Sequence, residues 1–436
     1  MRWLYACFMV LAQPLLRRKI ARRAVQEPGY LEAVEERFCR YTQPPLPVDG
    51  QTVWVHAVSL GETRAAAVLL ARLRAQWPGM RLLLTHGTAT GRAEGKSLLR
   101  PGDVQVWLPW DTPGAVQRFL AHFQPRIGIL METEVWPNLA AACARDGVPL
   151  VLANARLSAK SQRQAQRLAW LSLPAYRSLA AVWAQTQDDA ARFAALGVAV
   201  QGVFGNLKFD ATPDAAQLAA GRAWRTAAGR PVVMFASSRE GEELALLHIL
   251  KSFRAQALDH PSSGAPDLIA CETQAVQWLI VPRHPQRFDE VASLIESEGF
   301  TLSRRSRWGT QPDAAEIWLG DSLGEMALYY GLSDAALLGG SFAPLGGQNL
   351  IEAAACGCPV LMGPHTFNFS EAAELAQAAG AATRHASLRQ AVGAVLGLVG
   401  DGGHQAAMAE AAGRFALAHR GATDRTVAAV LALVRP

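Results

Sequence analysis

The sequence has few cysteines and few charged residues for its length. Its 436 residues include six cysteines with no CxxC pair, and only Cys356 and Cys358 lie close together. This pattern excludes a disulfide framework and a zinc knuckle, and it predicts a reducing compartment. Charged residues make up 18% of the chain and hydrophobic residues 50%, which excludes a disordered protein and indicates a large core.

The short motifs of several enzyme classes are missing as well. The chain has no GxGxxG or GxxxxGKS loop, no Asp-x-Asp triplet, no histidine pair at the spacing of a helical metal site, and no GxSxG turn. These absences argue against dinucleotide binding, P-loop chemistry, a divalent-metal nucleotide site and a serine hydrolase. We therefore expect neither a bound metal nor a cofactor.

Positive charge is concentrated at the N-terminus. The formal net charge is +5, and residues 1–23 contribute +6 with no acid among them. The difference leaves the other 413 residues at −1, which is close to neutral. A local basic segment of this kind argues against nucleic acid as a partner and favours an anionic membrane surface.

The same N-terminus carries an apolar run over residues 3–16, interrupted by Gln13 and Pro14. Its length falls short of the roughly 20 residues that cross a bilayer as a helix. The basic cluster follows the apolar run, whereas a secretory signal would place its charge first. We expect residues 1–30 to form a membrane-anchor helix that spans or lies in the membrane from the cytoplasmic side. A buried N-terminal helix with a basic end is the alternative.

From residue 50 onward, short β-rich runs alternate with helical stretches such as 62–76. This alternation predicts parallel sheets covered by helices on both faces, and the length predicts two Rossmann-like α/β domains. The expected strands cover residues 52–58, 81–87, 104–109, 126–132, 149–155, 181–186, 200–205, 232–237, 278–284, 316–320, 335–341 and 359–364.

The expected domains are 31–210 and 211–436, with the connection within residues 206–231. The last helix of the chain could pack back on the first domain. The segment HPSSGAP, residues 260–266, is expected to be a surface loop.

Polar residues follow several of the expected strands, where ligands bind in open parallel sheets. In the first half these are Glu62, the pair Glu132 and Glu134, and Lys208. In the second half a glycine-rich stretch leads to a helix that should begin at about Asn349. Such a loop lets backbone amides approach a phosphate, so we expect a phosphate-bearing ligand.

Seven segments resemble, in order along the chain, the 3-deoxy-D-manno-octulosonic acid (Kdo) transferases of lipopolysaccharide synthesis. They read HAVSLGET, METEVWPNL, LANARLS, GNLKFD, VPRHPQRF, GDSLGEM and GGQNLIEAAACGCPVLMGPHTFNF. The resemblance implies a GT-B fold, in which two Rossmann-like domains face a cleft. It also implies transfer of Kdo from CMP-Kdo to the lipid A precursor lipid IVA, at the cytoplasmic side of the inner membrane.

The resemblance further assigns roles to residues. It implies that Glu62 is the general base and that Glu132 and Lys208 stabilise the transition state. The implied CMP contacts are Pro282, Arg283, Leu323, Gly324, Glu325, Asn349, Leu350, Ile351 and Glu352. The chain departs from the family at Arg239 and Gln348, where the family often has histidine. Because glutamine cannot carry a proton or a charge, an acid role at position 348 is in doubt.

A base that accepts the acceptor's proton, together with direct displacement, predicts inversion at the anomeric carbon. Simpler structural roles remain open for these residues: Glu62 could merely be an acid in the first turn of a helix, and Glu132 could hold a basic neighbour. A sugar-nucleotide epimerase of the same fold and a non-catalytic, membrane-bound nucleotide sensor are the alternative functions.

Overall fold

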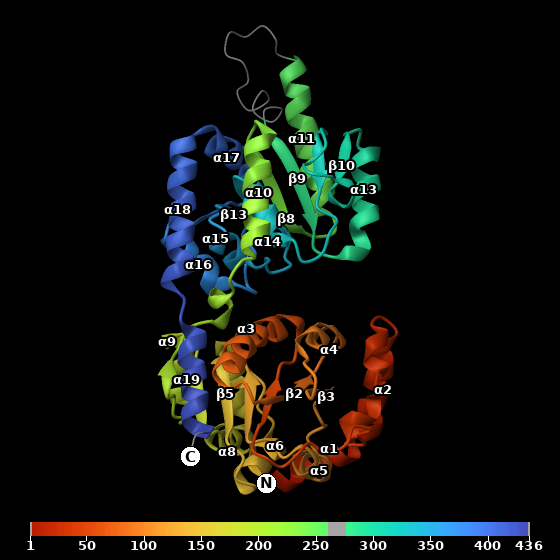
Figure 1. Cartoon of the computed structure of the whole chain (residues 1–436), viewed down its shortest axis with the longest axis vertical. Coiled ribbons are helices and arrows are strands. Elements are labelled where there is room, and N and C mark those ends of the chain that lie inside the picture. Colours follow the sequence, from red (N-terminus) through yellow and green to blue (C-terminus); the bar gives the residue numbers. More distant parts are fainter. Residues whose placement is uncertain (1, 260–275, 435–436) are drawn as a thin grey trace. The chain divides into compact units, whose positions relative to one another are not determined.

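The structure, a computed structural model, describes residues 2–259 and 276–434. It divides into two compact units, one formed by Met1–Asp210 with His419–Pro436 and the other by Ala211–Ala418. Each unit is an α/β fold with a seven-stranded sheet flanked by helices (Figure 1). The loop expected at 260–266 lies outside the described residues.

Unit 1, which contains the N-terminus, has a fully parallel sheet in the order β3-β2-β1-β4-β5-β6-β7. Its strands are β1 (Thr52–His56), β2 (Arg81–His86), β3 (Val104–Trp107), β4 (Ile127–Met131), β5 (Leu150–Ala155), β6 (Ala181–Ala184) and β7 (Gly202–Val203). All seven lie within the runs expected from the sequence.

The helices of unit 1 cover both faces of this sheet. They are α1 (Arg2–Leu11), α2 (Gln13–Ala24), α3 (Leu60–Gln76), α4 (Ala89–Gly95), α5 (Pro113–Phe123), α6 (Pro137–Arg145), α7 (Ala159–Arg167), α8 (Ala169–Arg177), α9 (Gln187–Ala195) and α19 (Ala422–Val434). Short 3-10 helices are η1 (Pro28–Leu31), η2 (Val34–Phe38), η3 (Lys96–Leu98) and η4 (Leu207–Asp210).

The strands are continuously apolar because the sheet of unit 1 is buried on both sides. On β1, Val53 and Val55 pack in the core beneath α3 and α19, whereas Trp54 points to the opposite core. There its indole meets the ring of Phe119 from α5, with ring centroids 5.0 Å apart. These two cores hold the carboxyl edge of the sheet in a fixed position.

Unit 2 repeats the architecture with a parallel sheet in the order β10-β11-β9-β8-β12-β13-β14. Its strands are β8 (Val232–Ser238), β9 (Gln277–Pro282), β10 (Leu302–Arg304), β11 (Ile317–Leu319), β12 (Ala335–Leu338), β13 (Val360–Met362) and β14 (Ala382–Arg384). Its helices are α10 (Ala215–Ala228), α11 (Glu242–Asp259), α13 (Phe288–Ser297), α14 (Met326–Leu332), α15 (Leu350–Ala355), α16 (Ser370–Ala378), α17 (Leu388–Gly400) and α18 (Gly402–Ala418), with η5 (Pro285–Arg287) and η6 (Arg305–Arg307).

The sequence analysis missed the two edge strands of unit 2, β10 and β14. Each has three residues, and their sequences are LSR and ATR. An edge strand has one neighbour and pairs along one side only, so it can be short and partly polar. The hydrophobic pattern in such a strand is too short to predict it.

The N-terminal segment forms two consecutive helices, α1 and α2, in place of the single anchor helix expected over residues 1–30. Pro14 lies in the first turn of α2, where its missing N–H costs no hydrogen bond. In the part of the chain that the structure describes, no helix has the length and apolar character needed to cross a membrane.

Each sheet has one point at which the strand order reverses. In unit 1, β1 lies between β2 and β4, and in unit 2, β8 lies between β9 and β12. Ligands of doubly wound sheets bind beyond the carboxyl ends of the strands at such a point. The segments that follow β1 and β4, and those that follow β8 and β12, are therefore where functional side chains should lie.

Candidate functional site

Glu62 lies in the first turn of α3, immediately after β1. Ser59 caps this helix, and its hydroxyl lies 3.2 Å from Glu62 Oε1. The amide of Val58 donates to Glu62 Oε2 over 2.8 Å. Burial, and to a lesser extent the nearby Glu132 carboxylate, raise the pKa of Glu62 to about 8. A carboxyl group with a pKa near the working pH can accept a proton and release it again.

Glu132 and Lys208 form an ion pair at the same edge of the sheet. Lys208 Nζ, from η4, lies 3.2 Å from Glu132 Oε1, and both side chains are largely buried. Since Glu132 follows β4 and Glu62 follows β1, the two carboxylates flank the reversal point of the sheet. The structure thus brings together the three residues that the sequence singled out in unit 1.

Two residues at this edge have left-handed backbone conformations that side chains rarely adopt. Glu132 has φ of 61°, and Asn154, near the end of β5, has φ of 53°. Asn154 Oδ1 accepts from the amide of Leu207 over 3.0 Å, so it positions the turn that carries Lys208. Strained conformations of this kind cluster at functional sites. The sequence analysis did not select Asn154, although its segment LANARLS was noted.

Glu134 is held in a different way. Its Oε2 lies 3.7 Å from Nε2 of the buried His56, and it accepts from Trp136 Nε1 over 3.2 Å. Burial opposes ionisation of Glu134, but the hydrogen bonds and the charge of His56 lower its pKa overall. The charged form is therefore favoured at Glu134 and disfavoured at Glu62. Sequence reasoning missed His56, because a histidine within an apolar strand gives no distinct signal.

In unit 2 the residues after β8 anchor the glycine-rich loop after β12. The buried Glu242 carboxylate accepts from the amides of Gly340, over 2.7 Å, and Arg239, over 3.0 Å. Gly340 has φ of 68°, and Gly346 and Gly347 also lie in the left-handed region. Glycine is needed there because only glycine adopts that conformation without strain. The sequence analysis did not identify Glu242, which ties together the two segments at the reversal point.

The two departures from the family pattern, Arg239 and Gln348, both lie next to Gly340. A Cβ atom placed on Gly340 would lie 3.1 Å from Gln348 Nε2 and 3.6 Å from Arg239 Cγ. The two side chains are therefore neighbours against the same loop backbone. Arg239 brings a permanent positive charge to this place, which Gln348 cannot supply.

Basic residues gather after β9, where Pro282 is the last residue of the strand. Burial lowers the pKa of His284, and the charges of Arg239, Arg283 and Arg287 lower it further, so these cations lie close together. Arg287 is paired with the buried Glu243, with Nη1 2.8 Å from Oε1.

The segment after β11 contains Leu323, Gly324 and Glu325. Leu323 is exposed, at 72%, and Gly324 has φ of 77°. Glu325 is bound by Arg305 Nη2 over 2.7 Å and by the hydroxyl of Ser322. A ligand that contacts Glu325 would therefore meet a carboxylate whose position is already fixed.

Asn349 caps α15, and its Oδ1 accepts from the amide of Ile351 over 3.1 Å. The helix begins at Leu350, close to the predicted position. Leu350 and Ile351 are buried, whereas Glu352 is half-buried. Leu350 and Ile351 thus face the core, and Asn349 and Glu352 are the polar groups of this segment.

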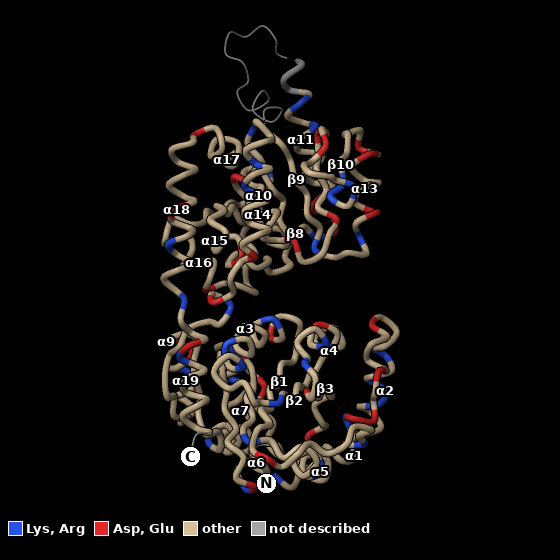
Figure 2. The backbone as a smooth tube through the Cα atoms, in the orientation of Figure 1, with Lys and Arg blue, Asp and Glu red and all other residues tan. Residues whose placement is uncertain are grey.

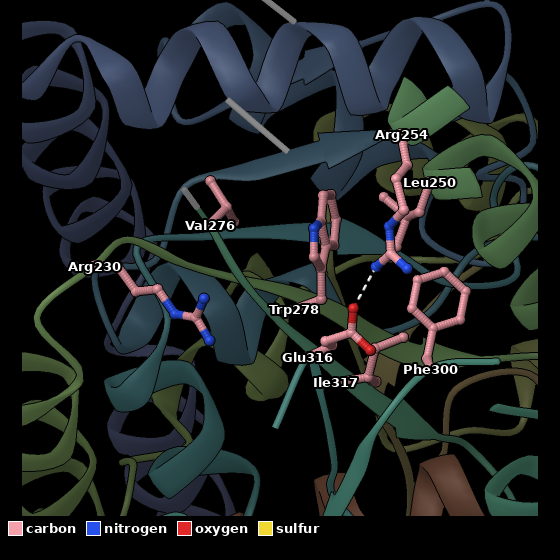
Figure 3. Close-up of a pocket in the computed structure, with 8 residues that line it drawn as sticks. All are labelled: Arg230, Leu250, Arg254, Val276, Trp278, Phe300, Glu316 and Ile317. Atoms are coloured by element: carbon pink, nitrogen blue, oxygen red, sulfur yellow. Dashed lines mark hydrogen bonds and ion pairs between the residues drawn. The ribbon is translucent and has the colours of Figure 1, made fainter. Parts of the chain in front are cut away.

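A cavity of about 430 Å³ lies at the opposite edge of the sheet of unit 2 (Figure 3). Its wall includes Trp278 and Ile317, which are at the amino ends of β9 and β11. Arg254 and Glu316 form an ion pair across it. Since ligands of parallel sheets bind at the carboxyl ends, we do not assign the donor nucleotide to this cavity.

Comparison with known proteins decides the family. Residues 32–211 match the model of the family described as 3-deoxy-D-manno-octulosonic-acid transferase (kdotransferase). A transferase of the same name from Bordetella pertussis is 46% identical over 425 residues, which is 96% of each chain. The protein belongs to the 3-deoxy-D-manno-octulosonic acid transferase family. It is therefore an enzyme, a glycosyltransferase.

Other relatives agree with this assignment. The family member from Haemophilus influenzae is 34% identical over 374 residues, covering 85% of this chain and 84% of that protein. Among solved structures, a UDP-GlcNAc 2-epimerase from Neisseria meningitidis, bound to UDP-GlcNAc, matches with a TM-score of 0.55 over 87% of this chain and 100% of that chain. At 14% identity this likeness shows the fold alone.

Proposed function

We propose that this family member transfers Kdo from CMP-Kdo to the lipid A precursor lipid IVA, with inversion at the anomeric carbon. The observation that carries the mechanism is the half-buried Glu62 carboxyl group, with its raised pKa, beside the Glu132–Lys208 pair. A hydroxyl oxygen of the acceptor attacks the anomeric carbon, and the bond from that carbon to the CMP phosphate breaks. The bonding electrons leave with CMP, and the hydroxyl proton passes to Glu62.

Glu62 suits the role of base because its surroundings balance two opposite effects. Burial and Glu132 disfavour its charge, while the Val58 amide and the Ser59 hydroxyl stabilise it. A carboxylate that is poorly solvated binds a proton more strongly, which helps it to take one from a sugar hydroxyl. Lys208 keeps Glu132 paired, so positive charge is present where the transition state develops.

The donor is proposed to bind unit 2 at the carboxyl ends of β8, β9, β11 and β12. Arg239 and Arg283 would face the phosphate, and the glycine-rich loop would offer backbone amides. Asn349 and Glu352 have the polar atoms to bind the ribose or the base. The departing phosphate gains negative charge as its bond breaks, and these cations compensate for that charge. The proposed reaction uses no cofactor.

The enzyme is further proposed to work on the cytoplasmic side of the inner membrane, held by α1 and α2. Side chains of Trp3, Phe8, Leu11 and Leu15 are exposed, from 64% to 78%. Basic residues follow along α2, as Figure 2 shows. Exposed apolar side chains beside basic ones are typical of a helix that lies in the interface of anionic lipids, and the basic excess favours the cytoplasmic face.

The test is detergent-solubilised turnover of the lipid A precursor with CMP-Kdo, followed by mass spectrometry. The parent should add the mass of Kdo, and Glu62→Gln should reduce the rate by about 10²- to 10⁴-fold, the range for loss of a general base. Glu94→Gln is the matched control, because Glu94 is an acid of unit 1 that pairs with Arg64 on the surface.

Two results would contradict the proposal. If the parent protein bound CMP but added no Kdo to the lipid, the result would favour a non-catalytic nucleotide sensor of this fold. Release of an epimerised sugar from a nucleotide sugar, without an acceptor, would favour the epimerase. Full activity of the Glu62→Gln variant would leave the transferase proposal standing but would show that Glu62 is not the general base.

A further inference from the structure

A second cavity, of about 290 Å³, lies in unit 1 and is separate from the donor residues. It is formed by α2, by η1 and η2, and by the segments that follow β1, β2, β3 and β4. Val58 lines it, and the amide of Val58 donates to Glu62. The cavity therefore adjoins the proposed base.

Arg37 is the buried cation of this cavity, with 5% of its surface exposed. Its guanidinium lies 3.9 Å from the ring centroid of Trp107, and Nη2 donates to the carbonyl of Gly87 over 3.1 Å. Within residues 2–259 and 276–434, no hydrogen-bond acceptor is within reach of Arg37 Nε, and no carboxylate lies within 4.0 Å to form an ion pair. A buried charge without a counter-charge is costly unless a ligand supplies one.

Other cations surround Arg37. Burial, helped by the charges of Arg92 and Arg23 and opposed by Tyr30 and Glu36, lowers its pKa to about 10, so Arg37 remains charged at neutral pH. Lys19 and Arg23, both exposed on α2, line the same cavity. The indole Nε1 of Trp110, in the cavity wall, is a second buried donor for which the described residues provide no acceptor.

The two acids of the wall are held by other partners. Asp111 accepts from the amides of Asn138, over 3.0 Å, and Leu139, over 2.8 Å, at the start of α6. Glu134 lies near His56 and accepts from Trp136. Neither acid forms an ion pair with a cation of the cavity in the described part of the chain, and three cations against two acids leave the wall with a net charge of +1.

We propose that this cavity binds a phosphoryl group carried by the sugar of the acceptor. The inference rests on the proposed function and adds the chemistry by which the acceptor is recognised. A phosphoryl group carries close to two negative charges and several acceptor oxygens, which suits Arg37 together with Lys19, Arg23 and the Trp110 N–H. Rings such as Trp110 and Trp136 offer flat walls to a sugar.

Because the cavity adjoins Glu62, a phosphoryl group bound there would position the acceptor for the reaction. A phosphoryl group fixed by Arg37 would hold the acceptor sugar, so that its free hydroxyl points toward the base through the Val58 side of the cavity. Lys19 and Arg23 belong to the helix proposed to lie on the membrane, which is where a lipid-borne sugar would enter. Arg37 is thus a specificity-determining residue for the acceptor.

The test compares the lipid A precursor with the same lipid after phosphatase treatment, in the full-length parent and in Arg37→Gln, Lys19→Gln and Arg22→Gln. Arg37→Gln should raise the KM for the phosphorylated lipid about 10- to 100-fold, as expected for loss of charge-assisted hydrogen bonds. It should change the KM for the treated lipid by less than about threefold, since the partner group is then absent. The KM for CMP-Kdo should stay constant.

Lys19→Gln should give a smaller effect of the same kind, about three- to fivefold, since its charge is exposed. Because Lys19 is exposed, this variant keeps the test valid if Arg37→Gln does not fold, which circular dichroism would show. Arg22→Gln is the matched control, since Arg22 is an exposed cation of α2 outside the cavity wall. An equal preference for the phosphorylated lipid in the parent, Arg37→Gln and Lys19→Gln would overturn the proposal.

Calorimetric binding, without CMP-Kdo, separates this inference from the proposed function and from other sources of phosphate. Arg37-dependent binding of the phosphorylated lipid by a parent that transfers no Kdo would support the site while the transferase failed. Inorganic phosphate bound as tightly as the lipid would overturn the acceptor assignment. The acceptor assignment would also be overturned if the protein bound phosphatidylglycerol vesicles and this binding were lost in Arg37→Gln but kept in Arg22→Gln.

Discussion

The two units have the same sheet topology but different side chains at the reversal point of the strand order. In unit 1 the segments after β1 and β4 carry the carboxylates Glu62, Glu132 and Glu134. In unit 2 the segments after β8 and β12 carry Arg239, the anchoring Glu242 and left-handed glycines. The two units thus place different chemistry on one scaffold: unit 1 has carboxylates at this point, and unit 2 has a cation and backbone amides. We propose that the first set serves proton transfer and the second binds a phosphate.

The largest of these effects is expected at the half-buried ion pair between Lys208 and Glu132 in unit 1. Lys208→Met removes the positive charge beside Glu132 and should lower kcat about 10²- to 10³-fold, the cost typical of losing one electrostatic contact to a transition state. Kinetics with both substrates would measure it. Lys160→Met, an exposed lysine of α7, is the control. A kcat within a few fold of the parent would make the pair a structural contact only.

A change in unit 2 should affect binding more than chemistry. Glu242→Gln weakens the charged hydrogen bonds to the amides of Arg239 and Gly340, so the glycine-rich loop loosens. The KM for CMP-Kdo should rise about tenfold, in line with charged hydrogen bonds. Glu240→Gln, an exposed acid of the same turn, should leave it unchanged. A fall in kcat at constant KM would contradict the division of roles between the units.

The pH dependence of kcat/KM should show the coupling between Glu62 and Glu132. The base must be ionised, so the rate should rise with pH through about 8, the pKa of Glu62. Glu132→Gln removes a negative charge that raises this pKa, so the midpoint should move to lower pH, by about one unit. Rates from pH 5 to 10 would measure both. An unmoved midpoint in Glu132→Gln would show that another group titrates.

The last expected effect concerns stability. Because the pKa of Glu62 in the fold lies above the usual carboxyl value, its favourable contribution is complete below about pH 4.5 and is lost progressively as pH rises to about 8. Glu62→Gln lacks this loss, so its stability relative to the parent should increase by up to about 4 kcal/mol between pH 5 and pH 9. Urea unfolding at the two pH values would measure the difference. A variant less stable than the parent at pH 9 would contradict the raised pKa of Glu62.

Much of this arrangement follows from local sequence, because buried parallel strands and helical periodicity are local patterns. The twelve expected strands and the helix at 62–76 have counterparts in the structure. The pairing of Glu132 with Lys208 was not predictable from spacing, since 76 positions separate them and the sheet order brings them together. Asn154, His56 and Glu242 were missed for a related reason. Asn154 and Glu242 act through hydrogen bonds to distant backbone, and His56 through its contact with the Glu134 side chain. Such contacts leave no periodic signal in the sequence.

The return of the chain to unit 1 has a consequence for its synthesis. Helix α19 places Val427, Val430 and Leu431 in the same core as β1, yet it is translated after the whole of unit 2. Unit 2, formed by the continuous stretch Ala211–Ala418, can complete its core during translation. The unit that is translated first is therefore finished last. A premature stop codon that removes only α19 would uncover an apolar face of unit 1 and expose the truncated product to proteases.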